Sequence, residues 1–152
     1  MQPRNVLIAA TAAALALTAG AAHAGRRCDA AWPSAAIIER GLGLAQRTVA
    51  ELDQAYARDG TRVVLLARAG QDLTRYGQQW SHVGWAYRTP QGTWRVVHKL
   101  NHCGSDQSVV MRQGLGEFFL DDLWRYQASW RAAPRPWQDA LWQLLQDNRR
   151  AV

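Results

Sequence analysis

The chain has 152 residues, 48% of them hydrophobic and 20% charged, and it carries a formal net charge of +6. This length fits one domain that is large enough to bury a core. All of the basic residues except Lys99 are arginines, and they are scattered along the chain. A nucleic-acid surface would show a basic stripe or patch, so we expect no nucleic-acid partner.

The first residues have the pattern of a secretory signal peptide. Arg4 precedes an apolar run over residues 6–17, and Ala22-His23-Ala24 supplies a small-residue cleavage motif. The apolar run is shorter than the roughly 20 residues that cross a bilayer, so we expect no stable membrane span. We predict that residues 1–24 are removed and that residues 25–152 form a single domain in the periplasm or outside the cell.

The chain has two cysteines, Cys28 and Cys103. An even number of cysteines in an oxidising compartment predicts a disulfide. This bridge would tie the N-terminus to the middle of the chain and stabilise the fold by roughly 4 kcal/mol. The alternative is a reactive Cys103 thiol, and an intact bridge excludes it.

The order of hydrophobic patterns predicts an α+β domain, with a small antiparallel sheet and flanking helices. Spacings of three and four predict a first helix that has Pro33 in its first turn and ends before Asp59-Gly60. The further elements expected in chain order are a strand at 61–69, a short turn or helix at 73–79, strands at 80–88 and 93–100, a short helix at 114–120, a strand at 123–132 and a helix at 137–150.

Two histidines should meet on the central hairpin. The turn-rich loop 89–92 pairs residues whose numbers add to about 181 or 182, so His98 becomes a diagonal neighbour of His82. Alternation along the strand places His82 on one face of the sheet and Trp85 on the other. A register slip of one residue would separate the two histidines.

Several side chains around this hairpin are candidates for a binding site. They are Asp72, Ser81, Trp85 and Asn101, and a turn cap would explain Asp72 equally well. The chain is also rich in tryptophan, with eight residues. Aromatic rows can bind glycans, but tryptophan more often fills a core because it buries a large apolar area, and we favour the core.

A set of spaced motifs resembles a family of exported bacterial proteins called domain of unknown function 2145. The resemblance runs from about Cys28 to the end of the chain. The motifs are Leu66-Ala67-Arg68-Ala69-Gly70-Gln71-Asp72-Leu73, Tyr76-Gly77, Ser81-His82-Val83-Gly84, Trp94-Arg95-Val96-Val97-His98-Lys99-Leu100-Asn101, Cys103-Gly104, Gly114-Leu115 and Phe118-Phe119-Leu120-Asp121-Asp122.

The strand with Ser81-His82-Val83-Gly84 is more distantly similar to the permuted papain-like hydrolases, which include NlpC-type peptidases. This similarity implies a partial papain-like domain in which His82 is the general base and His98 orients it. The nucleophilic cysteine of those enzymes follows the strands at the start of a helix, whereas Cys103 lies in a loop. The family resemblance also implies a C-terminal segment that does not follow Val152, so we expect a shortened member.

Three functions are therefore open. We favour a non-catalytic exported domain that keeps its pocket as a binding site for a cell-envelope polymer or peptide, without a cofactor. The alternative is a papain-like thiol hydrolase or amidase that uses His82, His98 and Cys103 on envelope amide or ester bonds. The weakest alternative is a metal site formed by His82, His98, His102 and Cys103. No ligand pair among them has a recognised zinc spacing, and we expect no metal.

Overall fold

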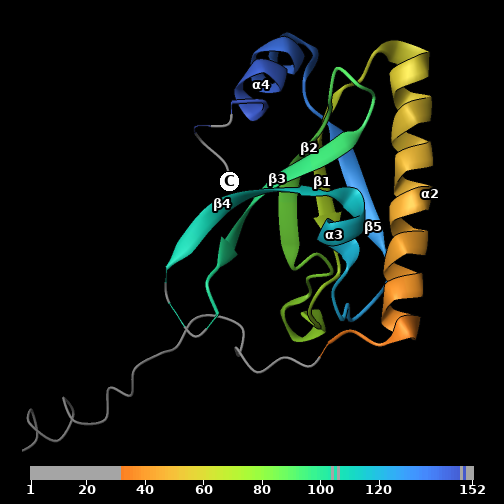
Figure 1. Ribbon diagram of the computed structural model, residues 1–152, viewed down its shortest axis with the longest axis vertical. Helices are drawn as coiled ribbons and strands as arrows, with labels where there is room; N and C mark the ends of the chain where they lie inside the picture. Colours follow the sequence, from red (N-terminus) through yellow and green to blue (C-terminus); the bar gives the residue numbers. More distant parts are fainter. Residues whose placement is uncertain (1–31, 104, 106, 148, 150–152) are drawn as a thin grey trace, which may run out of the picture.

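Five strands form one antiparallel sheet in the part of the chain that the structure describes. The computed structural model describes residues 32–103, 105, 107–147 and 149 (Figure 1). The strands have the spatial order β4-β3-β2-β1-β5. Their bounds are Val63–Arg68 for β1, His82–Arg88 for β2, Trp94–Asn101 for β3, Ser108–Gly114 for β4 and Ala128–Ala132 for β5.

Helices accompany this sheet, so the α+β class is confirmed. They are α2 at Ala35–Asp59, α3 at Leu115–Phe119 and α4 at Gln138–Leu145, with short 3-10 helices η1 at Thr74–Tyr76 and η2 at Arg135–Trp137. None of the helices within the described ranges is both long and apolar enough to cross a membrane. The predicted signal peptide, residues 1–24, lies outside the described residues.

The long helix α2 begins and ends at defined caps. The Ser34 hydroxyl accepts a hydrogen bond from the Ile37 N–H at 3.3 Å, and Gly60 closes the helix with a positive φ of 72°. The expectation that Pro33 lies in the first turn was wrong, because Pro33 precedes the capping serine. The helix was expected to end before Asp59, but it includes Asp59 and ends one residue later than predicted, at the Gly60 cap.

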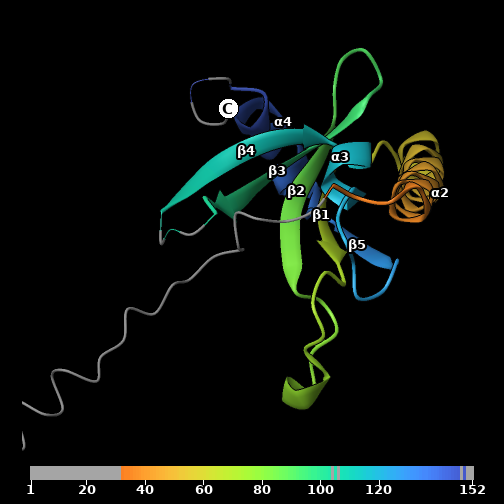
Figure 2. The same ribbon diagram turned by 60° about the horizontal axis from the view of Figure 1, so that its bottom comes forward.

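The two faces of the sheet carry separate apolar clusters. Figure 2 shows α2 and α4 on opposite sides of the sheet. One face packs against α2 and α3 through Leu52, Val64, Leu66, Val96 and Phe118 among others. The other face packs against α4 through a smaller cluster that includes Val63, Tyr87, Ala133, Leu145 and the part-buried Trp85 and Trp142. The favoured core role fits the buried Trp94 and the part-buried Trp85, Trp130 and Trp142, whereas Trp32 and Trp137 are exposed.

Strand β4 was missed by the sequence prediction. Within the described part of the chain it is an edge strand that pairs with β3 alone, and none of its residues is fully buried. A half-exposed edge strand need not show the clean alternation of a strand with one buried face. The predicted strand at 123–132 shortens to β5, and the predicted helix at 137–150 shortens to α4.

A buried glutamine joins α4 to the sheet. The Gln138 carboxamide accepts hydrogen bonds from the N–H groups of Arg62 and Val63, at 3.1 and 2.9 Å, and donates to the carbonyls of Val63 and Ala133, at 3.0 and 2.9 Å. All four positions on this side chain are therefore used. They satisfy backbone groups where the pairing of β1 with β5 ends.

Candidate functional site

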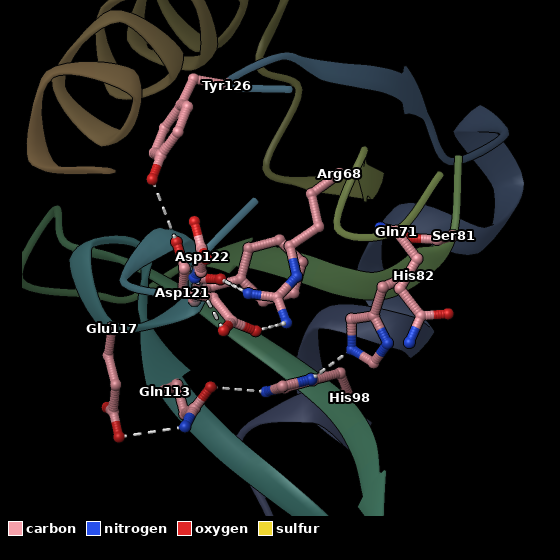
Figure 3. A network of polar contacts seen from close by, with 11 residues as sticks. Arg68, Gln71, Ser81, His82, His98, Gln113, Glu117, Asp121, Asp122 and Tyr126 are labelled. Carbon is pink, nitrogen blue, oxygen red and sulfur yellow. Dashed lines mark hydrogen bonds and ion pairs between the residues drawn. The ribbon is translucent and has the colours of Figure 1, made fainter. Parts of the chain in front are cut away.

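His82 and His98 form a direct contact between neighbouring strands. Strand β2 pairs with β3 so that Trp85 lies opposite Val97, which confirms the expected sum of 182. The two histidines are then diagonal neighbours, and the His82 Nε2 atom lies 2.7 Å from His98 Nδ1 (Figure 3). Their rings meet edge to face, with centroids 5.0 Å apart.

The contact continues as a chain of hydrogen bonds to α3. His98 Nε2 lies 2.7 Å from the carboxamide oxygen of Gln113 on β4, and the Gln113 amide nitrogen donates to the Glu117 carboxylate at 3.0 Å. We call His82, His98, Gln113 and Glu117 the polar relay. Figure 3 shows that its members project from β2, β3, β4 and α3 toward one another.

The relay determines which nitrogen of each ring carries the proton. A carboxylate only accepts hydrogen bonds, so the Gln113 NH2 group must face Glu117 and the Gln113 oxygen must face His98. His98 Nε2 then donates to Gln113, and in the neutral ring His98 Nδ1 is left as an acceptor. His82 Nε2 therefore carries a proton and donates it to His98.

Gly84 provides the space in which the His98 side chain sits. A Cβ atom at Gly84 would lie 2.9 Å from His98 Cβ and 2.6 Å from Val96 Cγ1. Contacts of that length are too short for ordinary packing, so only glycine permits this close approach of the two strands.

Phe118 and Arg68 form the inner wall behind the histidines. The Phe118 ring lies with its centroid 5.2 Å from that of His98 and 5.8 Å from that of His82. The Arg68 guanidinium stacks 4.9 Å from the Phe118 centroid, donates to the Phe118 carbonyl oxygen and pairs with Asp121 at 3.1 Å. These contacts hold the C-terminal end of α3 against β1.

Both histidines are held in the neutral form. Burial, followed by the positive charge of Arg68 and the neighbouring His98, lowers the pKa of His82 from 6.5 to about 4. Burial also lowers the pKa of His98, although its hydrogen bond to Gln113 acts in the opposite direction. At neutral pH the pair is therefore uncharged, as the donor and acceptor assignment of the relay requires.

A cavity of about 590 Å³ opens beside the histidines. Five of the predicted residues line it: His82, His98, Cys103, Ser81 and Asn101. Sequence reasoning missed the other polar lining residues, which are Arg68, Gln71, Gln113, Glu117, Asp121 and Asp122. The motifs of the family resemblance contain Arg68, Gln71, Asp121 and Asp122. Nothing in the local sequence indicated that these residues lie near the hairpin.

Ser81 and Asn101 lie at the ends of the hairpin strands that face the cavity. The Ser81 hydroxyl accepts a hydrogen bond from the Gln71 backbone N–H at 2.9 Å, so it also shapes the loop that follows β1. Asn101 ends β3 and is exposed. Both residues are placed where they could contact a ligand.

Two other predicted binding residues lie elsewhere. Trp85 is on the opposite face of the sheet, where it packs in the α4 cluster, because strand alternation turns its side chain away from His82. Asp72 accepts hydrogen bonds from the backbone and hydroxyl of Thr74, at 3.0 and 2.6 Å. The hydroxyl bond is the main cause that lowers the pKa of Asp72, which acts as a turn cap.

Two of the alternatives, a reactive thiol and a metal centre, can be compared with the residues that the structure describes. Cys103 lines the cavity, but no cysteine is free among the residues that the structure describes. Its predicted partner Cys28 lies outside those residues, so the disulfide stays a prediction. Over the same part of the chain, no group of three histidine, cysteine, aspartate or glutamate side chains is arranged to hold a metal ion.

The site thus belongs to an α+β domain in which a neutral histidine pair faces a polar cavity. A protein family described as "Uncharacterized protein conserved in bacteria (DUF2145)" matches residues 55–152, and the chain belongs to this family. The match begins inside α2, later than the expected start near Cys28. No curated protein and no solved structure matches the chain, so the similarity to papain-like hydrolases stays a hypothesis.

Proposed function

We propose that this protein is an exported, non-catalytic binding domain whose cavity beside His82 holds part of a cell-envelope polymer or peptide. The observation that carries the proposal is the cavity itself, which joins an oriented neutral histidine pair to several other polar side chains. A volume of about 590 Å³ lies in the range of small-ligand sites. Export is supported by the sequence of residues 1–24.

The absence of a suitable nucleophile favours binding over catalysis. A thiol hydrolase needs a thiolate within reach of its base. The cysteine at this cavity, Cys103, is not a free cysteine. The Ser81 hydroxyl is held by the Gln71 N–H, and no contact joins it to the His82 ring among the described residues.

One observation favours the hydrolase as a second candidate. His82 is held by His98 in the way that a general base is held by an orienting group. In that case Cys103 would have to be reduced and to move next to His82. The cysteine would attack an amide or ester carbonyl, and His82 would take its proton.

Turnover and binding assays separate the two candidates. The reduced and the oxidised protein are incubated with peptidoglycan fragments and acyl-ester probes, with and without iodoacetamide. We expect no turnover in either redox state and a weaker binding of the fragments by His82→Ala. Turnover that iodoacetamide and Cys103→Ser both abolish would establish the hydrolase.

Export has an independent test. Mass spectrometry of protein from the cell envelope should show Gly25 as the N-terminal residue, and peptide mapping without reduction should recover Cys28 linked to Cys103. Retention of residues 5–20 would refute the signal peptide, and two freely alkylated thiols would refute the disulfide.

A further inference from the structure

One nitrogen of His82 is available to a ligand. The Nε2 atom faces His98, and no partner faces Nδ1 among the described residues. His82 lines the cavity and is only partly buried. In Figure 3 its second ring nitrogen lies on the side away from His98, toward Gln71. The chemical character of Nδ1 therefore decides what the cavity can bind at this point.

We propose that Glu117, through Gln113 and His98, fixes His82 in the form protonated on Nε2, so that the bound ligand must donate a hydrogen bond to Nδ1. This inference rests on the proposed binding function and specifies the chemistry of its ligand. Glu117 acts as a positioning residue, since it reaches His82 only through the other members of the relay.

The carboxylate is the member of the relay that determines its direction. An amide and two neutral imidazoles can each reverse their donor and acceptor roles, so these three residues alone would allow either direction. Glu117 cannot reverse, because a carboxylate has no proton to donate. If the Gln113 oxygen faced it at 3.0 Å, two acceptors would be in contact without a proton between them.

The charges around the cavity further restrict the chemical class of the ligand group at Nδ1. An anionic group would meet the Nδ1 lone pair and the carboxylates of Glu117 and Asp122, and the Arg68 guanidinium that also lines the cavity is already paired with Asp121. A cation beside His82 would lose its hydration and would be repelled by Arg68, and these two effects also oppose protonation of this ring. A neutral donor avoids both costs. We therefore assign the ligand group at Nδ1 as a hydroxyl or an amide N–H, the donors that sugars and peptides carry.

Nitrogen NMR tests the tautomer directly. In the full exported chain labelled with 15N-histidine, long-range 1H–15N spectra at pH 7 should show both His82 and His98 protonated on Nε2 alone. In Glu117→Gln the new amide lets Gln113 turn over, so a second form of His82, protonated on Nδ1, should appear. The control Asp122→Asn removes a carboxylate that lines the same cavity but lies outside the relay, and it should keep the single form.

Matched small probes test the ligand class on the same spectra. Acetamide and acetate have nearly the same shape, but acetamide is a neutral N–H donor and acetate an anionic acceptor. Acetamide should shift the His82 Nδ1 resonance and acetate should leave it in place. A single Nε2-protonated form that persists in Glu117→Gln, or a shift caused by acetate alone or by both probes equally, would overturn the inference.

The binding function and the donor requirement at His82 can each fail without the other. If neither probe shifts His82 and envelope fragments also do not bind, the proposed binding function is wrong, whatever the tautomer. If fragments bind without moving the Nδ1 resonance, the binding function stands and the donor requirement at His82 is wrong.

Discussion

His82 Nε2 lies 2.7 Å from His98 Nδ1 although the two residues are not opposite each other on the hairpin. Continuing the observed register by one pair beyond Trp85 and Val97 places Gly84 opposite His98. The His98 side chain therefore reaches His82 diagonally, over the position of Gly84, which has no side chain in the way. The histidine contact depends on the missing side chain at position 84.

Gly84→Ala should displace His98 and destabilise the domain. The added methyl group would meet Val96 Cγ1 at 2.6 Å and His98 Cβ at 2.9 Å. Overpacking of this kind costs about 1 to 3 kcal/mol. We expect the free energy of unfolding in urea to fall by that amount and the His82 and His98 nitrogen resonances to change. In the control Gly114→Ala, on β4, the methyl group meets no atom within 4 Å, and these resonances should stay unchanged.

The stability of the domain should fall as the pH drops from 6.5 toward 4. His82 has a pKa of about 4 in the folded protein, whereas in the unfolded chain it should have the ordinary value of 6.5. Between these values the unfolded state binds more protons, so the stabilising difference is complete above pH 6.5 and is lost as the pH falls through 4. The lowered pKa of His98 acts in the same direction.

The size of this effect follows from the two pKa values. The full difference would correspond to roughly 3 kcal/mol, and partial exposure of His82 reduces this to on the order of 2 kcal/mol. The charged and titratable groups around His82 are Arg68, His98, Asp121 and, through the relay, Glu117. Urea unfolding at several pH values should show that the free energy of unfolding depends less on pH in His82→Gln than in the wild type. His102→Gln, in an exposed loop, should behave like the wild type, and an equal flattening in both variants would contradict the assignment.

Replacing either of two glycines in α2 with alanine should change the stability of the domain in opposite directions. A Cβ atom at Gly41 would lie 2.7 Å from the Phe119 carbonyl oxygen, where α2 packs closely on α3. At Gly43 the nearest atom is a flexible Arg47 nitrogen at 3.5 Å. Gly41→Ala should therefore destabilise the domain by about 1 to 3 kcal/mol, and Gly43→Ala should stabilise it by up to about 1 kcal/mol, the helix preference of alanine over glycine. Thermal unfolding of both variants checks the prediction, and stabilisation by Gly41→Ala would show that the two helices are not in close contact.

The hairpin was predictable because its information is local. The turn-forming residues of 89–92 set the register, and alternation then placed His82 and His98 together and Trp85 on the other face. The choice of Trp85 as a binding residue neglected that alternation. Asp72 was equally consistent with a turn cap, and the structure shows the cap.

The rest of the site depends on contacts between distant parts of the chain. Gln113 reaches His98 because the edge strand β4 pairs with β3, and Glu117 follows four residues later in α3. Arg68 ends a strand whose other residues are largely apolar, and its partners Phe118 and Asp121 are about 50 residues away. Patterns of apolar spacing carry no information on such pairings. The polar relay and its contact with Arg68 and Phe118 could therefore not be predicted from the sequence.

Arg68→Met should raise the pKa of His82 and loosen the end of α3. The Arg68 charge is one cause of the low His82 pKa, and it also neutralises Asp121, whose negative charge acts in the opposite direction. Without the guanidinium, both changes favour protonated His82, so its pKa should rise from about 4 toward 6.5. Since Arg68 is almost fully buried and Asp121 is partly buried, loss of one partner should also cost roughly 3 kcal/mol of stability.

The matched control is Arg62→Met, which removes an arginine from the other side of the sheet. Arg62 pairs with the exposed Asp139 and stacks on the Trp142 ring, 4.2 Å from its centroid. Its loss should cost about 1 kcal/mol or less, as for other exposed ion pairs, and should not change the titration of His82. An NMR titration of the histidine resonances from pH 3.5 to 7.5 gives the pKa in each variant. An unchanged His82 pKa in Arg68→Met would contradict the prediction and would mean that burial and the neighbouring His98 keep this ring neutral.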